Sequence, residues 1–424
     1  MRALTKYYFD YAATAPLDPR VLRAMSPFFS HSFGNPSSLY RLGREAKLAA
    51  DQAHQIFIDT LGGSPTKFIF TSSATEANNL AILGAARSLR DLGNHVIVSA
   101  IEHKGILSVA SALEAEGFQI TQIGVDRDGI VDPQELSSAL NDKTILVSIT
   151  TADNETGTIQ PLKNIADAIK KFRDTHQQSH PYLHTDATQA AAHLNLDIDH
   201  LPVDMLTLSA HKLGGPKGIG GLLVRGEIKL EPITYGGRQQ NDLRPGTENI
   251  SAIVGFARAF ELATQERREE FQRIKKLRDY LERTILKNIP KVILNGHPIK
   301  RLPNFLNISI LDIEGEAILL RLDDKKISVG TGSACNSQTL EPSHSIEALG
   351  LPHEYIHGSL RFTLGRYTTM SSVNYALKQL TIIVKDLRKM SPLNLKVVGT
   401  GKPTSVPQAF VREGVPHFVR RKKK

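Results

Sequence analysis

Short apolar runs alternate with longer segments of helical spacing over the first half of the chain. The apolar run at residues 203–208 is typical of a buried strand. We expect further strands at residues 67–71, 95–100, 118–125, 145–149, 182–185 and 221–225, most of them separated by helices. Repeated strand–helix units predict an α/β fold with a mostly parallel sheet and helices on both faces.

The pattern changes after residue 250. Residues 250–288 carry one apolar stripe at helical spacing, which predicts a single long helix leading to a second domain. Beyond it we expect strands at residues 306–311, 327–329 and 359–363 and helices at residues 315–322, 343–349 and 371–390, a mixture typical of a smaller α+β domain. We therefore predict a large domain of residues 14–260, a small domain of residues 1–13 and 261–390, and a basic, flexible tail of residues 391–424.

Positive charge is concentrated in that tail. The 424-residue chain has a formal net charge of +9; eight basic residues against Glu413 give the tail +7, so the remainder holds only +2. We therefore expect no direct nucleic-acid binding; the alternative, a nucleic-acid-binding role, would rest mostly on the tail. No apolar stretch approaches the roughly 20 residues that span a bilayer, and the N-terminus has no signal-peptide pattern, so we expect a cytoplasmic protein without membrane contact.

Lys212 stands between the predicted strand at residues 203–208 and a glycine-rich segment at residues 213–220. A lysine at such a place must be paired, solvated or used chemically. A lysine whose pKa is lowered by burial and neighbouring cations can form a Schiff base with a carbonyl cofactor. A solvated glycine-rich turn is the alternative that these residues leave open.

Polar side chains follow several predicted strands, whose carboxyl ends meet at one edge of a parallel sheet. They include Thr75, His103, Asn154, Asp186, Gln189, Ser209 and His211. Asp186 can keep a pyridine nitrogen protonated and His103 can stack on the ring, while the amides of Gln189 and Asn154 can bind the phenolic oxygen and the substrate. The helix start at residues 72–76 suits a phosphate. The set predicts pyridoxal phosphate; helix capping by Asp186 and a structural role for His103 are the alternatives.

Cys335 is the only cysteine in the chain, which excludes an internal disulfide and a multi-cysteine metal site. It lies in a segment of glycines and small hydroxylic residues, residues 329–339, which predicts a mobile loop. A cysteine in an exposed loop is a candidate nucleophile or sulfur carrier. An inert packing role is the alternative, although inert cysteines are more often buried.

In combination, these motifs resemble the cysteine desulfurases of the class V aminotransferase-like group, in particular the IscS/NifS branch. The segments that carry the resemblance are residues 74–76, 102–104, 154–157, 186–189, 209–220, 244–247, 332–335, 337–343 and 361–366. The similarity extends over about residues 7–390. It implies fold type I of the pyridoxal-phosphate-dependent transferases, the aspartate aminotransferase-like fold, and a homodimer.

The resemblance also implies a role for each matching position. Lys212 would hold pyridoxal phosphate, and His103 would stack on the ring and move protons. The other cofactor contacts would come from Ala74, Thr75, Asn154, Asp186, Gln189, Ser209, His211 and the partner subunit's Thr247. Arg361 would clamp the carboxylate of L-cysteine, with Asn154 also contacting this substrate. Cys335 would take the sulfur as a persulfide and leave L-alanine.

Three functions stay open at this point. A desulfurase would pass its sulfur to an iron–sulfur scaffold protein or to sulfur carriers for tRNA thiolation, and would need both Lys212 and Cys335. Another pyridoxal-phosphate enzyme, such as a selenocysteine lyase or an aminotransferase, would not need Cys335. A non-catalytic scaffold would need neither residue, so the presence of Lys212 argues against it. We expect no resident metal site; Cys335 would contact an iron–sulfur cluster only transiently.

Overall fold

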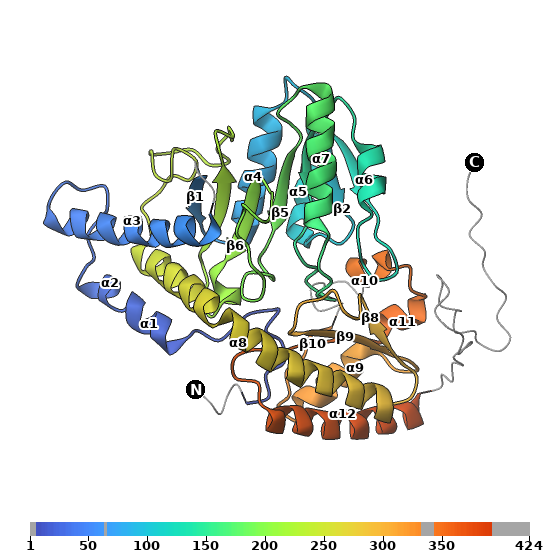
Figure 1. Ribbon diagram of the computed structural model, residues 1–424. Coiled ribbons are helices and arrows are strands. Elements are labelled where there is room, and N and C mark those ends of the chain that lie inside the picture. Colours follow the sequence, from blue (N-terminus) through green and yellow to red (C-terminus); the bar gives the residue numbers. More distant parts are fainter. Residues whose placement is uncertain (1–5, 63–65, 332–342, 392–424) are drawn as a thin grey trace.

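The computed structural model describes residues 6–62, 66–331 and 343–391, and Figure 1 shows a large sheet and a small sheet at opposite ends of the molecule. The large sheet consists of β1 (Thr66–Thr71), β2 (His95–Ser99), β3 (Gln119–Ile123), β4 (Thr144–Ser148), β5 (Tyr182–Asp186), β6 (Met205–Ser209) and β7 (Gly220–Arg225). Its strand order is β1-β7-β6-β5-β4-β2-β3. The contiguous strands from β6 to β3 are parallel, which confirms the predicted mostly parallel sheet. Only β7 runs antiparallel to its neighbours, β1 and β6.

Helices cover both faces of this sheet (Figure 1). They are α3 (Arg41–Leu61), α4 (Ala74–Ser88), α5 (Lys104–Ala115), α6 (Pro133–Ala139), α7 (Leu162–His176) and the first part of α8 (Ile250–Asn288). Because alternate side chains of a strand point to opposite faces, Phe68 and Phe70 of β1 join one apolar cluster while Ile69 joins another. All three of these side chains are buried, so β1 is apolar on both faces.

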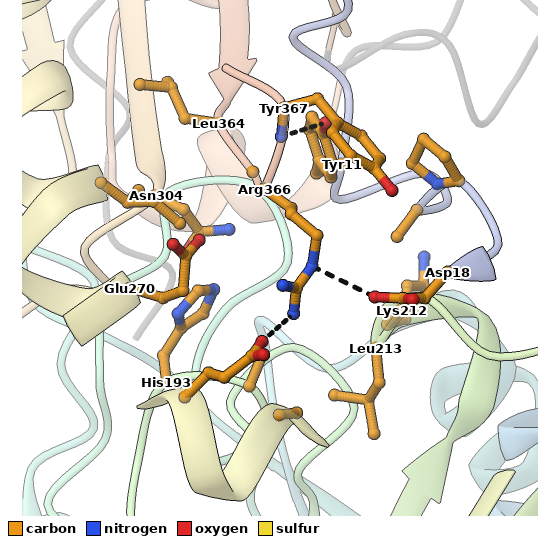
Figure 2. Close-up of a pocket in the computed structure, with 18 of the residues that line it drawn as sticks. Tyr11, Asp18, His193, Lys212, Leu213, Glu270, Asn304, Leu364, Arg366 and Tyr367 are labelled. Atoms are coloured by element: carbon orange, nitrogen blue, oxygen red, sulfur yellow. Dashed lines mark hydrogen bonds and ion pairs between the residues drawn. The ribbon is translucent and has the colours of Figure 1, made fainter. Parts of the chain in front are cut away.

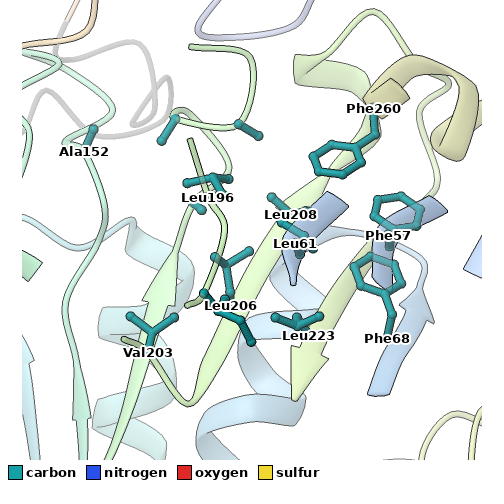
Figure 3. Packing of buried hydrophobic residues seen from close by; sticks show 14 of the residues in the cluster. Phe57, Leu61, Phe68, Ala152, Leu196, Val203, Leu206, Leu208, Leu223 and Phe260 are labelled. Carbon is teal, nitrogen blue, oxygen red and sulfur yellow. The ribbon is translucent and has the colours of Figure 1, made fainter. Parts of the chain in front are cut away.

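Aromatic rings fill the space between α3, α8 and the sheet. Phe57 stacks on Phe68 with ring centroids 3.9 Å apart and on Phe260 at 4.8 Å. Figure 3 shows these three rings beside Leu208 and Leu223 of the sheet. Burial of such large side chains stabilises the fold by about 1.5–3 kcal/mol each. The start of α8 is therefore fixed against the large sheet.

The second half of α8 packs elsewhere. Its residues Ile274, Leu281 and Ile285 belong to a separate apolar cluster around the small antiparallel sheet. That sheet has the order β10-β9-β8, with β8 (Val292–Asn295), β9 (Phe305–Ile310) and β10 (Ser359–Thr363). The helices here are α9 (Gly315–Asp323), α10 (His344–Ala348), α11 (His353–His357) and α12 (Met370–Met390). The helix α8 thus joins two apolar cores.

Some local predictions were wrong. Residues 327–329 form no strand; Ser328 makes a single bridge to Tyr8. Residues 19–30 form two short helices, α1 (Pro19–Met25) and α2 (Pro27–Ser30), because Pro27 has no N–H to continue the first helix. The sequence analysis also missed β8 and α11, which are too short to show a period. None of the described helices combines the length and apolarity that a membrane span needs.

Candidate active site

A cavity of about 250 Å³ opens at the strand ends of the large sheet. Nine predicted residues line it together: Ala74, Thr75, His103, Asn154, Asp186, Gln189, Ser209, His211 and Lys212. They come from positions far apart in the sequence, which the parallel strands bring to one edge. Ser73, Asn78, Thr150, Ala152 and Thr188 also line the cavity and were not predicted.

The N-terminus of α4 forms one wall of this cavity. Ser73 caps the helix by accepting the N–H of Glu76 at 3.1 Å. Gly220 pairs with both Thr71 and Ser209, and a Cβ atom there would lie 2.7 Å from the backbone nitrogen of Ala74. Only glycine therefore lets β7 approach the helix start so closely. The first N–H groups of a helix have no partner within it, and they favour an anion.

Asp186 is the last residue of β5 and is buried. One carboxylate oxygen accepts the N–H of Thr188 at 2.8 Å, and the other accepts the side-chain N–H of Asn78 at 2.8 Å. Both oxygens are thus fixed at the cavity wall. Sequence reasoning missed Asn78; the available signal was a pair of amide residues within the otherwise apolar helix α4.

Lys212 ends the short 3₁₀ turn that follows β6. Its Nζ donates to the carbonyl oxygens of Ala12 and Ala13, the second at 2.8 Å. Gln189 Nε2 donates to the same Ala12 oxygen at 3.1 Å. The N-terminal segment therefore lies against the lysine and holds its amine at the edge of the cavity.

Two histidines of the cavity are kept neutral by their surroundings. Burial lowers the pKa of His103, with Lys212 lowering it further and Asp186 opposing the change. The backbone N–H of Gly105 donates to His103 Nδ1 at 3.1 Å, so the neutral ring carries its proton on Nε2. Burial, with Lys212 and a second lysine nearby, lowers the pKa of His211 to about 4.

Glu102 lies beneath the cavity wall with no exposed surface. Its Oε1 accepts the hydroxyl of Ser99 and the backbone N–H of Thr150, both at 2.6 Å. Burial raises the pKa of Glu102 to about 8, so its carboxyl is mostly protonated at neutral pH. Because Thr150 lines the cavity, this buried carboxyl positions part of the wall. The sequence offered no signal beyond its place next to His103.

Arg361 lies on β10, next to the cavity rather than in its lining. Its Nη1 donates to the carbonyl oxygen of Asn154 at 2.9 Å, and its Nη2 forms an ion pair with Asp10 at 2.9 Å. The sequence analysis missed Asp10 because the two partners lie 351 positions apart. Through Asn154, the guanidinium is connected to the residues of the cavity.

Besides Arg361, two predicted residues do not line this cavity. Thr247 is exposed on the loop after β7 and does not line the cavity of its own chain. Cys335 lies outside the described residues. The described residues that flank its segment are Thr331 and Ser343, both buried.

A second cavity, of about 90 Å³, lies on the other side of Lys212 at the junction of α8 with the small sheet. Figure 2 shows Arg366 between Asp18 and a carboxylate of α8, which belongs to Glu266. His193 lies across the cavity, and burial lowers its pKa to about 4. Through its ion pairs, Arg366 connects the loop after β10 with the N-terminal segment and with α8. All three line the cavity together with Lys212.

Comparison with known proteins agrees with this architecture. The family model described as Aminotransferase class-V matches residues 7–375. A protein named cysteine desulfurase IscS from Dictyoglomus turgidum is 46% identical over 385 residues, which cover 91% of this chain and 96% of the relative. A protein of the same name from Methanosarcina thermophila is 46% identical over 389 residues, covering 92% and 94%.

Solved structures give the same result. A NifS-like protein superimposes with a TM-score of 0.84 at 33% identity, covering 90% of this chain and 100% of that chain. The structure described as SspA in complex with cysteine has a TM-score of 0.73 at 33% identity, covering 86% and 100%. The chain therefore belongs to the class-V aminotransferase family, within its IscS/NifS group of cysteine desulfurases.

Proposed function

We propose that this chain uses pyridoxal phosphate to convert L-cysteine into L-alanine and keeps the sulfur on Cys335. The observation that carries the proposal is the single cavity lined by Lys212, the fixed carboxylate of Asp186 and the start of α4. A lysine amine, a carboxylate and a helix N-terminus are the groups that an aldehyde, a pyridine nitrogen and a phosphate require. Relatives at 46% identity carry the name cysteine desulfurase.

The donor set of the cavity fits pyridoxal phosphate, the cofactor of this family. Lys212 would bind the aldehyde, Asp186 the ring nitrogen and Gln189 the phenolic oxygen. The phosphate would be held by the helix start at Ala74 and Thr75 together with Ser209 and His211. When bound, the cofactor supplies an electron sink for bonds broken at the substrate.

The substrate would be held by Arg361 and Asn154. Arg361 already pairs with Asp10, so a substrate carboxylate would share or replace that partner. Its planar guanidinium suits two parallel hydrogen bonds to a carboxylate. His103, neutral and with its proton on Nε2, would stack on the cofactor ring and pass protons at that atom.

Sulfur transfer requires a thiol, and Cys335 is the only cysteine. Its thiolate would attack the substrate sulfur, so that a sulfur–sulfur bond forms as the carbon–sulfur bond breaks. The carbon takes up a proton, which makes L-alanine, and the enzyme thiol becomes a persulfide. The segment that carries Cys335 follows Gly330, which pairs with Arg361, and precedes His344, which contacts the Glu102 carbonyl at 2.8 Å. The described residues on either side of that segment thus contact groups next to the cavity.

We further propose a homodimer in which the partner subunit's Thr247 completes the phosphate site. Leu39 is 90% exposed and Tyr235 85% exposed, with Phe29, Phe33 and Tyr40 also exposed on the same N-terminal part of the chain. Leu39 lines a groove together with residues from Arg238 to Glu248, so it lies beside the loop that carries Thr247. Contiguous exposed apolar surface is typical of a protein–protein interface.

The sulfur acceptors that we propose are an iron–sulfur scaffold protein or carriers for tRNA thiolation, with the enzyme in the cytoplasm. We also propose the division into domains of residues 14–260 and of residues 1–13 with 261–390. The change of core along α8 supports that boundary. The tail, residues 391–424, lies outside the described residues except for Ser391.

The decisive experiment measures sulfide and L-alanine release from L-cysteine in the presence of a thiol reductant. The wild type should release both products. Cys335→Ala should retain the cofactor absorbance but lose sulfide release by at least about 10²-fold, since the nucleophile is gone. A Cys335→Ala variant as active as the wild type would contradict the persulfide step and favour a lyase or an aminotransferase.

A further inference from the structure

Two histidines stand side by side on the short helix α11, away from the active-site cavity. His353 and His357 are separated by one helical turn, and their Nε2 atoms lie 3.2 Å apart. Their ring centroids are 4.2 Å apart. Between them, Tyr355 and Ile356 are buried in a small apolar cluster. The buried pair fixes the helix, so the two imidazoles form a preorganised outward-facing pair.

We propose that His353 and His357 chelate a divalent first-row transition metal ion, with Zn²⁺, Ni²⁺ or Cu²⁺ as the class of ligand. Zinc binds imidazole nitrogen at about 2.0–2.1 Å, and two such ligands at a tetrahedral angle lie about 3.3–3.4 Å apart. The observed 3.2 Å between the Nε2 atoms is close to this separation. Without metal, the same two atoms share a hydrogen bond in which one ring donates.

A carboxylate lies near the ring nitrogen of His357 that faces away from His353. Glu314, which precedes α9, has Oε2 3.6 Å from His357 Nδ1. At 3.6 Å the carboxylate makes no hydrogen bond to Nδ1, but its negative charge favours the tautomer with the proton on that atom, which leaves the Nε2 lone pair free for a metal. Gly358 holds the end of the helix in place, since a Cβ atom there would meet the carbonyl oxygen of Ile310 at 2.3 Å.

The site has two protein ligands. The described part of the chain contains no group of three or more histidine, cysteine, aspartate or glutamate side chains arranged to hold a metal. Water or a small anion would therefore complete the coordination, which makes the site open and exchangeable. Imidazole ligands favour zinc, nickel and copper over magnesium and calcium, which prefer oxygen. The inference is independent of the function proposed for the cavity.

The test is calorimetric titration of the holoenzyme with Zn²⁺, using protein without a polyhistidine tag. Cys335→Ser should be present throughout, so that the thiol cannot bind the metal. We expect one equivalent of Zn²⁺ to bind, with the affinity at this site falling at least about tenfold in His353→Ala and in His357→Ala. Mg²⁺ should not bind there.

His200→Ala is the matched control, because His200 is 78% exposed and lies on a different part of the surface next to Asp197. It should bind Zn²⁺ as the parent does. Equal affinity in the parent and in all three alanine variants would overturn the proposal. Glu314→Gln should weaken binding by about tenfold, and an unchanged affinity would remove Glu314 from the site. Circular dichroism, and unchanged metal-free activity of His353→Ala and His357→Ala with Cys335 intact, would establish that these variants fold.

Discussion

The strand-end cavity differs from the exposed surface that carries Leu39 and Tyr235 in how far contacts within one chain satisfy its side chains. In the cavity, Asp186 is buried and both its oxygens are bonded within the chain, to Asn78 and Thr188. On the outer surface, large apolar side chains are exposed instead. One chain therefore supplies both partners of the Asp186 carboxylate by itself, whereas the exposed apolar side chains form the surface that we propose for the dimer.

The outer loop nevertheless has a defined shape. Gln240, Asn241 and Asp242 are consecutive residues with φ values of 49°, 62° and 63°, a conformation that costs free energy for residues other than glycine. Asparagine and aspartate tolerate it best. Gln240 offsets the cost by accepting the N–H of Phe70 at 2.7 Å and donating to Glu248. Hydrogen bonds, rather than burial, thus order the region that we assign to the dimer.

The largest effect is expected for Lys212→Ala, which removes the reactive amine of the cavity. Activity should fall by at least about 10³-fold, because both cofactor attachment and proton transfer depend on that amine. Lys217→Ala is a matched control, since Lys217 is exposed in the same glycine-rich loop. L-alanine release and cofactor absorbance after dialysis measure the two effects. Comparable losses in both variants would show that the loop, not the amine, matters.

The same contrast explains what the sequence could predict. Residues 250–288 show an apolar period and form the single helix α8 with those bounds. The polar residues after the strands could be grouped because parallel strands end at one edge, and eight of them do line one cavity. The local apolar pattern was sufficient to predict this helix, and the geometry of parallel strands was sufficient to group the cavity residues.

Contacts between distant positions were not predictable. The pairing of Arg361 with Asp10 depends on a bridge between the two ends of the described chain. The place of β7 between β6 and β1 depends on its pairing with β1, which is distant in the sequence, and no local period encodes such a partner. The neutral state of Glu102 arises from burial by several elements at once. Such features follow from tertiary packing, which outweighs local sequence preference.

A smaller effect is expected when the exposed surface is given a charge. Leu39→Asp should raise the dissociation constant of the dimer by about tenfold or more, because a buried carboxylate would have no partner in the interface. Ile299→Asp is the control, since Ile299 is 82% exposed near the small sheet. Light scattering over a range of protein concentrations measures the mass. If Leu39→Asp and the wild type dissociate alike, this surface does not form the dimer.

The last effect develops gradually with pH and concerns Glu102, a buried residue in contrast to the exposed ones above. Burial holds its pKa near 8 in the folded chain, against an ordinary value of 4.5. Between pH 4.5 and pH 8 the carboxyl of Glu102 keeps its proton in the folded state and has released it in the unfolded state. The contribution of Glu102 to the free energy of unfolding is therefore largest below pH 4.5 and falls as pH rises toward 8, by up to about 1.4 kcal/mol per pH unit.

Glu102→Gln separates this titration from the hydrogen bonds. The amide oxygen of glutamine can still accept from Ser99 and Thr150, so the variant should resemble the wild type near pH 5. Its stability relative to the wild type should then rise steadily toward pH 8, as measured by denaturation midpoints at each pH. Glu114→Gln, at an exposed position of α5, should show no such trend. A stability difference between the two proteins that stays constant across this range would mean that Glu102 is ionised in the folded chain despite its burial.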